Sequence, residues 1–407
     1  MSDSGKFMKI VIDDKIPFIK GVLEPYAEVV YLPGDRFTRS DVENADALII
    51  RTRTICDEAL LKNSSVKFIA TATIGYDHID TQWCEANAIA WSNAPGCNSG
   101  SVYQYIASVL STLSAHFGFK FEDKTLGVVG VGNVGSKVAR LGKALGMTVL
   151  MNDPPRSEKE GPAQFVPLGE VLSMSDIISL HVPLKSSGLH QTYHLFDKIT
   201  FEYLRRSTIL INSARGEVID SIALKNAIRK REIGAAVLDV WENEPDIDLE
   251  LLPLLNIATP HIAGYSADGK INGTAMSVQA LSRFFGLPLT EWYPSGAPDP
   301  AQSLHFELDC NGKSLQQCLC EAIWHTYAVN DDDGKLRTSP VTFEAQRGDY
   351  PIRREFEAFT VDLKGAIPQV EERLKELGFS VNKYLKMTFI CNNQSKEKLF
   401  LIKNVNI

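Results

Sequence analysis

Short apolar runs alternate with amphipathic, helix-sized segments at the beginning of the chain. Runs at residues 9–13, 47–50, 66–70 and 88–91 have the length and the apolar content of buried strands. Strands that alternate with helices predict a parallel sheet in an α/β domain. We expect this first, Rossmann-like domain over residues 1–97, with residues 2–7 as a leader outside its fold.

The longest helical stripe follows directly, because apolar residues recur on one side of residues 99–117. A helix over residues 268–286 is expected to return to the first domain, so that the chain crosses between two domains twice and leaves a cleft between them. The second domain, over residues 98–267, is expected to hold a doubly wound sheet of about six strands. Its apolar runs lie at residues 126–129, 148–151, 177–180, 208–211, 235–238 and 257–259.

The last part of the chain has a different pattern. Residues 286–300 are rich in Pro and Gly and predict a linker, and residues 314–329 predict a helix. Residues 331–334 are expected to be a loop, and residues 355–377 have helical periodicity with a break near Pro368. We expect an α/β C-terminal domain over residues 297–407 that forms a homodimer, since its helices have apolar faces and no catalytic set. The apolar bursts within residues 386–407 have no assigned role.

The strand at residues 126–129 runs into a glycine-rich turn and then into a helix. Gly130, Gly132 and Gly135 have the G-x-G-x-x-G spacing that lets a pyrophosphate approach the backbone at a helix N-terminus. Asp153, at the end of the next strand, is placed to accept hydrogen bonds from the adenosine ribose. Its charge would repel a 2′-phosphate, which favours NAD over NADP, although Arg156 nearby weakens that preference. A glycine-rich turn without a ligand is the simpler alternative.

Three other segments end strands at the edge where open α/β sheets place their ligands. They contain Arg215, then Asp239, Glu242 and Glu244, and finally His261. Singly, these residues suit a surface ion pair, a solvated acid or a helix cap. Together they are the set needed to oxidise a hydroxy acid, because the arginine binds the carboxylate and the histidine removes the hydroxyl proton. The carboxylate orients the imidazole and stabilises its protonated form.

These motifs resemble those of the D-isomer-specific 2-hydroxyacid dehydrogenases over roughly residues 8–285. The resemblance implies that Arg215, Glu244 and His261 are the catalytic arginine, glutamate and histidine. It also implies contacts with the cofactor at positions beyond the three glycines and Asp153. These positions are Asn133, Val134, Val182, Ser213, Ala214, Arg215, Asp239 and Gly264.

A narrower resemblance rests on residues 71–80, 91–98 and 259–266 and on the extra C-terminal segment. These are similar to the members of the family that oxidise 4-phospho-D-erythronate to (R)-3-hydroxy-2-oxo-4-phosphooxybutanoate in pyridoxal phosphate (pyridoxine) biosynthesis. The resemblance implies substrate contacts at Thr52, Thr73 and Tyr265, with threonine in place of the family's serine at position 52. Arg51 and Arg53 flank Thr52, so we expect the phosphate to be bound from the first domain.

Composition limits the alternatives. The chain has 407 residues, 44% of them hydrophobic, which suits two or three domains with buried cores. A net charge of −8 without a basic stripe argues against nucleic acid, and no apolar run has the length of a membrane span. The seven cysteines lack zinc-site spacing, so we expect no metal and reduced thiols in the cytoplasm.

Two other functions remain open at this point. Another D-2-hydroxyacid dehydrogenase, such as D-3-phosphoglycerate dehydrogenase, would share the catalytic residues, although the C-terminal segment lacks the pattern of a βαββαβ regulatory domain. A non-catalytic NAD-sensing protein would need the fold but not the proton-transfer set. Turnover with a hydroxy acid separates the enzyme from the sensor.

Overall fold

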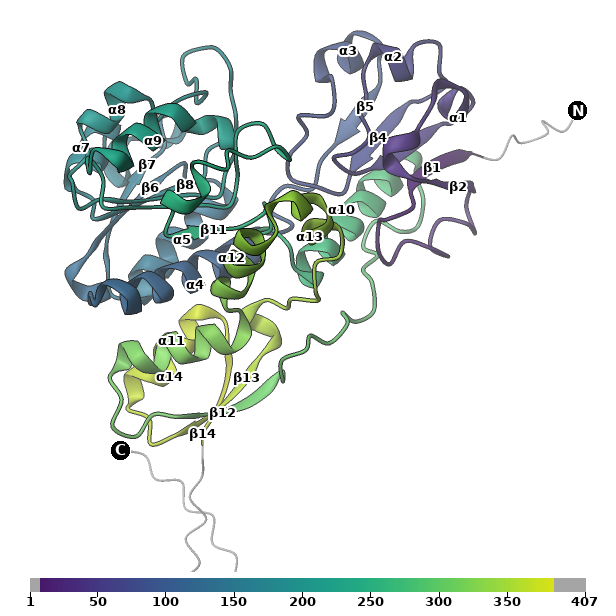
Figure 1. Ribbon diagram of the computed structural model, residues 1–407. Coiled ribbons are helices and arrows are strands. Elements are labelled where there is room, and N and C mark those ends of the chain that lie inside the picture. Colours follow the sequence, from purple (N-terminus) through teal and green to yellow (C-terminus); the bar gives the residue numbers. More distant parts are fainter. Residues whose placement is uncertain (1–7, 384–407) are drawn as a thin grey trace, which may run out of the picture.

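The computed structural model describes residues 8–383 and contains three separate parallel sheets with helices packed on them (Figure 1). The first sheet has the strand order β2-β1-β3-β4-β5 and confirms the α/β prediction for the beginning of the chain. Its strands are β1 (Lys9–Asp13), β2 (Glu28–Leu32), β3 (Ala47–Ile50), β4 (Phe68–Thr71) and β5 (Ala90–Ser92). The sequence analysis missed β2, although Val29–Leu32 is an apolar run; β2 is an edge strand whose apolar residues are only partly buried.

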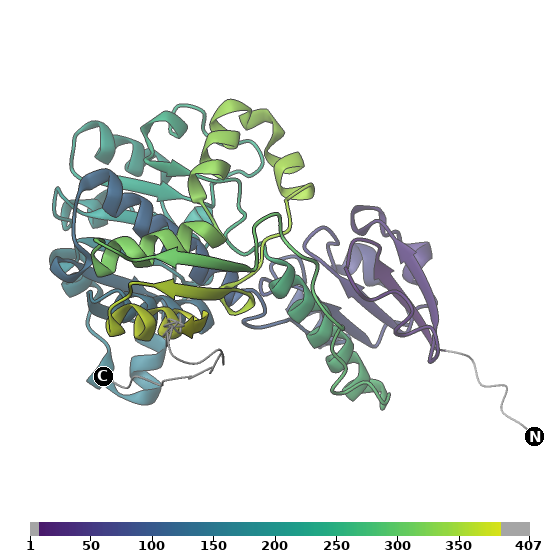
Figure 2. The ribbon, with the colours of Figure 1, turned by 90° about the horizontal axis from the view of Figure 1, so that it is seen from below.

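The short helices of the first domain are α1 (Arg39–Val42), α2 (Glu58–Leu61) and α3 (Thr81–Ala86). The long helix α10 (Ala267–Phe285) packs against the first sheet. Val278 and Leu281 of α10 are fully buried in one cluster with Ile10, Ile12 and Phe68 of the sheet. Figures 1 and 2 show α10 lying alongside the first sheet.

The second sheet has six strands in the order β11-β10-β9-β8-β6-β7, which confirms the doubly wound prediction. The chain leaves β6 toward β7 on one side and returns to β8 on the other, so the crevice between β6 and β8 is the topological switch point. The strands are β6 (Thr125–Val129), β7 (Thr148–Asn152), β8 (Ile177–Leu180), β9 (Ile209–Asn212), β10 (Ala235–Leu238) and β11 (Ile257–Ala258).

Helices cover both faces of this second sheet. The helix α4 (Ser99–Phe117), which matches its predicted bounds, packs on one face with α5 (Asn133–Ala144). Residues of α7 (Leu168–Met174), α8 (Lys198–Glu202) and α9 (Ser221–Arg229) form the apolar cluster on the other face. The helix α6 (Pro154–Glu160) follows β7.

The third sheet contains β12 (His305–Asp309), β13 (Thr360–Lys364) and β14 (Ser380–Lys383) in that order. Its helices are α11 (Leu315–Thr326), α12 (Val329–Thr338), α13 (Phe343–Gly348) and α14 (Pro368–Leu377). Short 3-10 turns elsewhere in the described chain lie at Gly34–Arg36, Phe121–Asp123, Pro162–Gln164, Gly216–Val218, Leu252–Leu254, Pro340–Thr342 and Phe356–Ala358.

Two predictions for this third domain were wrong. Residues 331–334 lie inside α12, where Asp331 and Asp332 occupy the first turn and Leu336 is buried. Acidic residues are common in loops, but they also stabilise the first turn of a helix, as Asp331 and Asp332 do here. Residues 355–377 are not one broken helix, because Val361 and Leu363 alternate with outward residues in strand β13.

The third domain shares its core with the second rather than hanging from a free linker. Val109 of α4, Ile323 of α11 and Val361 of β13 belong to one buried cluster. The connection after α10 begins by packing against the first domain, where Trp292 lies against the apolar cluster of the first sheet. Removing the third domain would therefore expose one face of α4 to water.

The segment at residues 351–355 joins the third domain to both chain crossings between the first and second domains. Arg354 forms a bidentate pair with Asp268 at the beginning of α10, with distances of 3.1 and 3.0 Å from its Nε. Arg353 donates to the carbonyl of Ala263 at 2.6 Å and to the hydroxyl of Ser101 in α4. We call residues 351–355 the hinge segment, because they contact the beginnings of both α4 and α10.

The remaining expectations concern the thiols, the membrane and the chain ends. Six cysteines in the described part are buried and unpaired, and residues 2–7 and 386–407 lie outside it. Within residues 8–383, no helix combines the length and apolar character that a bilayer span requires. No group of three metal-ligating side chains occurs in the same range.

Candidate active site

The glycine loop follows β6 at the switch point of the second sheet. Gly130 has φ +85°, and a Cβ at this position would lie 2.7 Å from the carbonyl of His181 after β8. A Cβ at Gly135 would collide with the carbonyl of Gly130, so α5 packs tightly against the turn. Gly132 is the N-cap of α5. It has no side chain that could accept hydrogen bonds from the backbone amides of the first turn, which begins at Asn133. These amides are free to meet an anion.

Asp153 lies directly after β7 and is bonded to the glycine loop. One carboxylate oxygen accepts the amide of Val131 at 2.8 Å, and the other accepts the amide of Arg156 at 3.1 Å. The guanidinium of Arg156 is turned toward Glu160, with a distance of 2.7 Å. Asp153 therefore lies at the end of β7 beside the glycine loop, as the sequence predicted, while the nearby arginine is already paired.

The other predicted cofactor positions lie at the same edge. Val182 follows β8 and would be 2.8 Å from a Cβ at Gly130, while Val134 is the second residue of α5. Ser213 follows β9 and its buried hydroxyl has no hydrogen-bond partner in the described chain. The buried Ala214 comes next, and Gly264 lies against Asn98 at the beginning of α4. The unsatisfied hydroxyl, the uncapped helix and the glycine turn all fit a dinucleotide.

His261 and Glu244 form a hydrogen-bonded pair beyond β10 and β11. Nδ1 of His261 is 2.7 Å from Oε2 of Glu244, while Oε1 of Glu244 accepts the amide of Trp241 at 2.9 Å. No described residue bonds to Nε2 of His261, whose side chain is 31% exposed. The imidazole is thus held from one side and available on the other.

The pair is electrostatically favourable. Burial raises the pKa of Glu244, but the hydrogen bond and charge of His261, the amide of Trp241 and the charge of Arg347 outweigh it, so the pKa is lowered. Glu244 is therefore an ionised acceptor at neutral pH. This is the charge state that fixes the proton of the imidazole on Nδ1 and leaves Nε2 as the basic atom.

Asp239 fixes the backbone from which His261 projects. Its carboxylate accepts the hydroxyl of Thr259 at 2.6 Å and the amides of Ile262 and Ala263 at 2.8 and 2.9 Å. The carbonyl of Asp239 also accepts the amide of His261 at 2.7 Å. Burial raises the pKa of Asp239, and these bonds oppose that rise. Asp239 therefore acts first as a structural support of this segment.

Arg215 lies after β9 at the boundary with the first domain. Its Nη1 donates to the carbonyl of Ala214 at 2.8 Å, and its Nη2 is 3.1 Å from Oδ2 of Asp77. Asp77 belongs to the loop after β4, so this ion pair joins the first and second domains. The guanidinium of Arg215 therefore already binds one carboxylate, that of Asp77.

The predicted substrate positions lie on three separate segments of the chain. Thr52 is exposed in the turn after β3, and the hydroxyl of Thr73 donates to the carbonyl of Gly75 at 2.9 Å. Tyr265 follows the His261 segment, and Lys270 and Arg347 stand over its ring. Substrate contacts at Thr52, Thr73 and Tyr265 therefore stay predictions.

The chain is similar to known dehydrogenases over most of its length. A family model described as the D-isomer specific 2-hydroxyacid dehydrogenase, NAD binding domain, matches residues 104–263, and a domain of unknown function matches residues 301–378. The chain is 49% identical to erythronate-4-phosphate dehydrogenase of Bacteroides fragilis over 87% of its own length and 99% of the relative's. It is 42% identical to the enzyme of the same name from Porphyromonas gingivalis, over 91% and 100%.

The chain belongs to the erythronate-4-phosphate dehydrogenase family.

Among solved structures, D-lactate dehydrogenase from Aquifex aeolicus, complexed with NAD and lactic acid, is similar with a TM-score of 0.59 and 26% identity. The match covers 72% of this chain and all of that one. This chain is accordingly an NAD-dependent dehydrogenase, and the predicted cofactor and enzyme class are confirmed.

Several residues of this member of the erythronate-4-phosphate dehydrogenase family were missed by sequence reasoning. Asp77 lies within residues 71–80, which resemble the family, but it pairs with an arginine 138 residues away. Lys270 is one cation on a helix, and Arg347 lies in the domain with no recognised motif. Nothing in the local pattern distinguishes these three from solvated surface charges.

Proposed function

We propose that this protein oxidises 4-phospho-D-erythronate to (R)-3-hydroxy-2-oxo-4-phosphooxybutanoate with NAD, as a step of pyridoxal phosphate biosynthesis. The observation that carries the proposal is the hydrogen-bonded pair of His261 and Glu244, with Arg215 at the same sheet edge as the glycine loop. The names of the relatives supply the substrate, since they match nearly the whole chain.

In this proposal His261 removes the proton of the C2 hydroxyl through Nε2, while Glu244 holds Nδ1–H and stabilises the resulting imidazolium. NAD, when bound, would accept the hydride from C2. The C2–H and O–H bonds break as the C2 carbonyl forms, so the proton remains on His261 and the two electrons leave with the hydride. Exchange of the histidine proton with water resets the base.

Arg215 binds the substrate carboxylate with its guanidinium fork and orients C2 toward the cofactor. To do so, Arg215 releases the carboxylate of Asp77 and binds that of the substrate instead. Asp77 is 62% exposed, and an ion pair so open to solvent is weak. Thr52, Thr73 and Tyr265 are proposed to bind the remaining polar groups of the substrate. Asp153 and Ser213 are proposed to bind the cofactor from the second domain.

The proposal is tested by measuring kcat/KM for 4-phosphoerythronate, erythronate and 3-phosphoglycerate by nicotinamide absorbance. A 2-oxo acid is supplied in case NADH leaves slowly. We expect a clear preference for the first compound. A preference for 3-phosphoglycerate would assign the chain to the alternative dehydrogenase activity, and binding of NAD without turnover of any acid would favour the sensing protein.

Replacing Asp153 with serine is expected to narrow the preference for NAD over NADP. The substitution removes the negative charge that would face a 2′-phosphate, and it keeps a hydroxyl that can accept the amide of Val131. The check is kcat/KM for both cofactors in the wild type and the variant. A wild type that prefers NADP would contradict the role of Asp153.

We also propose a domain scheme of residues 1–97 with returning helix 268–286, residues 98–267, and residues 297–407, and a cytoplasmic homodimer formed through the last of these. Buried, unpaired thiols suit a reducing compartment. Light scattering on the full-length chain at micromolar concentration is expected to give the mass of two chains, and a monomer would reject the dimer. Truncation at the linker is a poor control, because the third domain completes the core around α4.

A further inference from the structure

Two cations stand over the ring of Tyr265. Nζ of Lys270, in the first turn of α10, is 5.4 Å from the ring centroid, and Cζ of Arg347, in α13, is 5.9 Å from it. No described residue hydrogen-bonds to the hydroxyl of Tyr265. Lys270 of the first domain and Arg347 of the third therefore bring two positive charges to the ring of Tyr265, which follows the His261 segment of the second domain.

The charge of Arg347 is only partly compensated. Its Nη1 is 2.8 Å from Oε1 of Glu344, but Glu344 also pairs with Arg53, so two arginines share one carboxylate. The side chain of Arg347 is 17% exposed, and its Nε is buried without a partner among the described residues. Its field reaches the active site, because its charge is one of those that lower the pKa of Glu244 against the effect of burial.

Lys270 has no carboxylate partner in the described part of the chain. Burial lowers the pKa of Lys270, and the charges of Arg51 and Arg353 lower it further. Positive charge thus gathers at this point, and the carboxylate of Glu344 balances only part of it. A phosphate dianion would remove this imbalance, since it accepts charge-assisted hydrogen bonds from both kinds of side chain.

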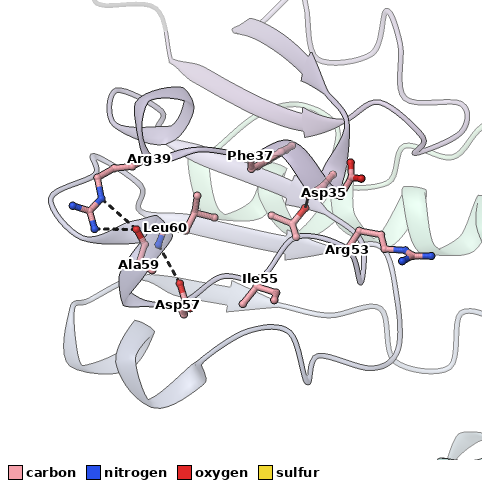
Figure 3. Close-up of a pocket in the computed structure, with 10 residues that line it drawn as sticks. Asp35, Phe37, Arg39, Arg53, Ile55, Asp57, Ala59 and Leu60 are labelled. Atoms are coloured by element: carbon pink, nitrogen blue, oxygen red, sulfur yellow. Dashed lines mark hydrogen bonds between the residues drawn. The ribbon is translucent and has the colours of Figure 1, made fainter. Parts of the chain in front are cut away.

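Arg51 and Arg53 of the first domain are less suitable for binding the substrate phosphate than the sequence indicated. Nε and Nη2 of Arg51 bind the buried carboxylate of Asp13 at 3.0 and 3.1 Å. Arg53 pairs with Glu344, and Figure 3 shows its side chain extending away from the other residues of the nearby pocket. That pocket, of about 310 Å³, also contains the carboxylates of Asp35 and Asp57, which disfavour an anion.

We propose that Lys270 and Arg347 bind the phosphate of the substrate, with the hydroxyl of Tyr265 donating to it. This inference rests on the proposed function, in which Arg215 takes the carboxylate and His261 the C2 hydroxyl. The far end of the four-carbon acid then lies toward α10 and α13. The third domain thereby contributes a specificity-determining residue to the site.

The test compares kcat/KM for 4-phosphoerythronate and for erythronate in Lys270→Met, Arg347→Met and the wild type. In each variant, kcat/KM for the phosphorylated acid is expected to fall about tenfold to a hundredfold, because one charge-assisted contact is lost. The kcat/KM for erythronate should change little. Arg347→Lys should recover part of the loss because it keeps the charge without the fork. Arg283→Gln, which removes an exposed cation from the same helix as Lys270, is the matched control.

The outcomes separate the two proposals. A wild type without preference for the phosphorylated acid would reject the proposed function itself. A wild type with that preference, retained in both variants, would reject the phosphate site alone, and loss of preference in Arg53→Gln would return the phosphate to the first domain. Inhibition by inorganic phosphate gives a second readout: it should weaken in Lys270→Met and not in Arg283→Gln.

Discussion

Replacing His261 with alanine is expected to lower kcat for oxidation by roughly 10²–10⁴-fold, the usual loss when a positioned general base is removed. The reason is geometric. His261 is the group whose free Nε2 projects from a segment fixed by Asp239, and Glu244 holds its other nitrogen at 2.7 Å. Steady-state kinetics at saturating NAD measure the loss, and near-normal turnover would contradict the assignment.

Two comparisons make this result specific. The KM for NAD should change little in His261→Ala, since the glycine loop and Asp153 lie on other strands. Glu244→Gln keeps the shape of the pair but removes the charge that stabilises the imidazolium, so it should also lower kcat, by less than His261→Ala. A Glu244→Gln variant with wild-type kcat would show that this carboxylate does not support the base.

The second large effect concerns stability rather than chemistry. Glu355, in the hinge segment, accepts the hydroxyl of Ser266 at 2.8 Å. Burial raises the pKa of Glu355 to about 7, helped by the charges of Asp268 and Glu357 and opposed by the Ser266 bond and Lys137. Between the unfolded value of about 4.3 and this folded value, the native protein holds a proton that the unfolded chain releases.

Stability must therefore fall as pH rises through that window. At about 1.4 kcal/mol for each pH unit, this group alone lowers the free energy of unfolding by on the order of 3 kcal/mol between pH 4.5 and 7. Glu355→Gln mimics the protonated form and should lack this decline. It should be more stable than the wild type above pH 7 and similar to it near pH 4.5.

Urea unfolding at several pH values measures the effect, with Glu357→Gln as the matched control because Glu357 is close by but exposed. Parallel pH profiles for wild type and Glu355→Gln would contradict a buried, protonated carboxyl. A similar gain in Glu357→Gln would indicate general charge reduction instead.

The features that sequence reasoning predicted are those encoded locally. The glycine loop, α4 and the strands of the second sheet each have a continuous pattern of spacing or hydrophobicity. The side chains of Arg215, Glu244 and His261 could be grouped because parallel strands place their carboxyl ends at one edge. Their roles remain predictions until the variants are measured.

What could not be predicted depends on contacts between distant segments. The pairing of Asp77 with Arg215 and of Arg53 with Glu344 requires the relative positions of domains, which no local pattern contains. The strand β13 was missed because five residues give too few alternations to outweigh a neighbouring helical period. The helix α12 was missed because acidic first turns and acidic loops have the same composition.

The hinge segment has a mechanical consequence. The chain crosses between the first and second domains where α4 and α10 begin, and Arg353 and Arg354 tie both points to the third domain. We therefore expect the stiffness of these two crossings to depend on contacts from the third domain. We expect Arg354→Gln to make the crossing at α10 more flexible. The rate of product release should then change, while the rate of hydride transfer stays the same.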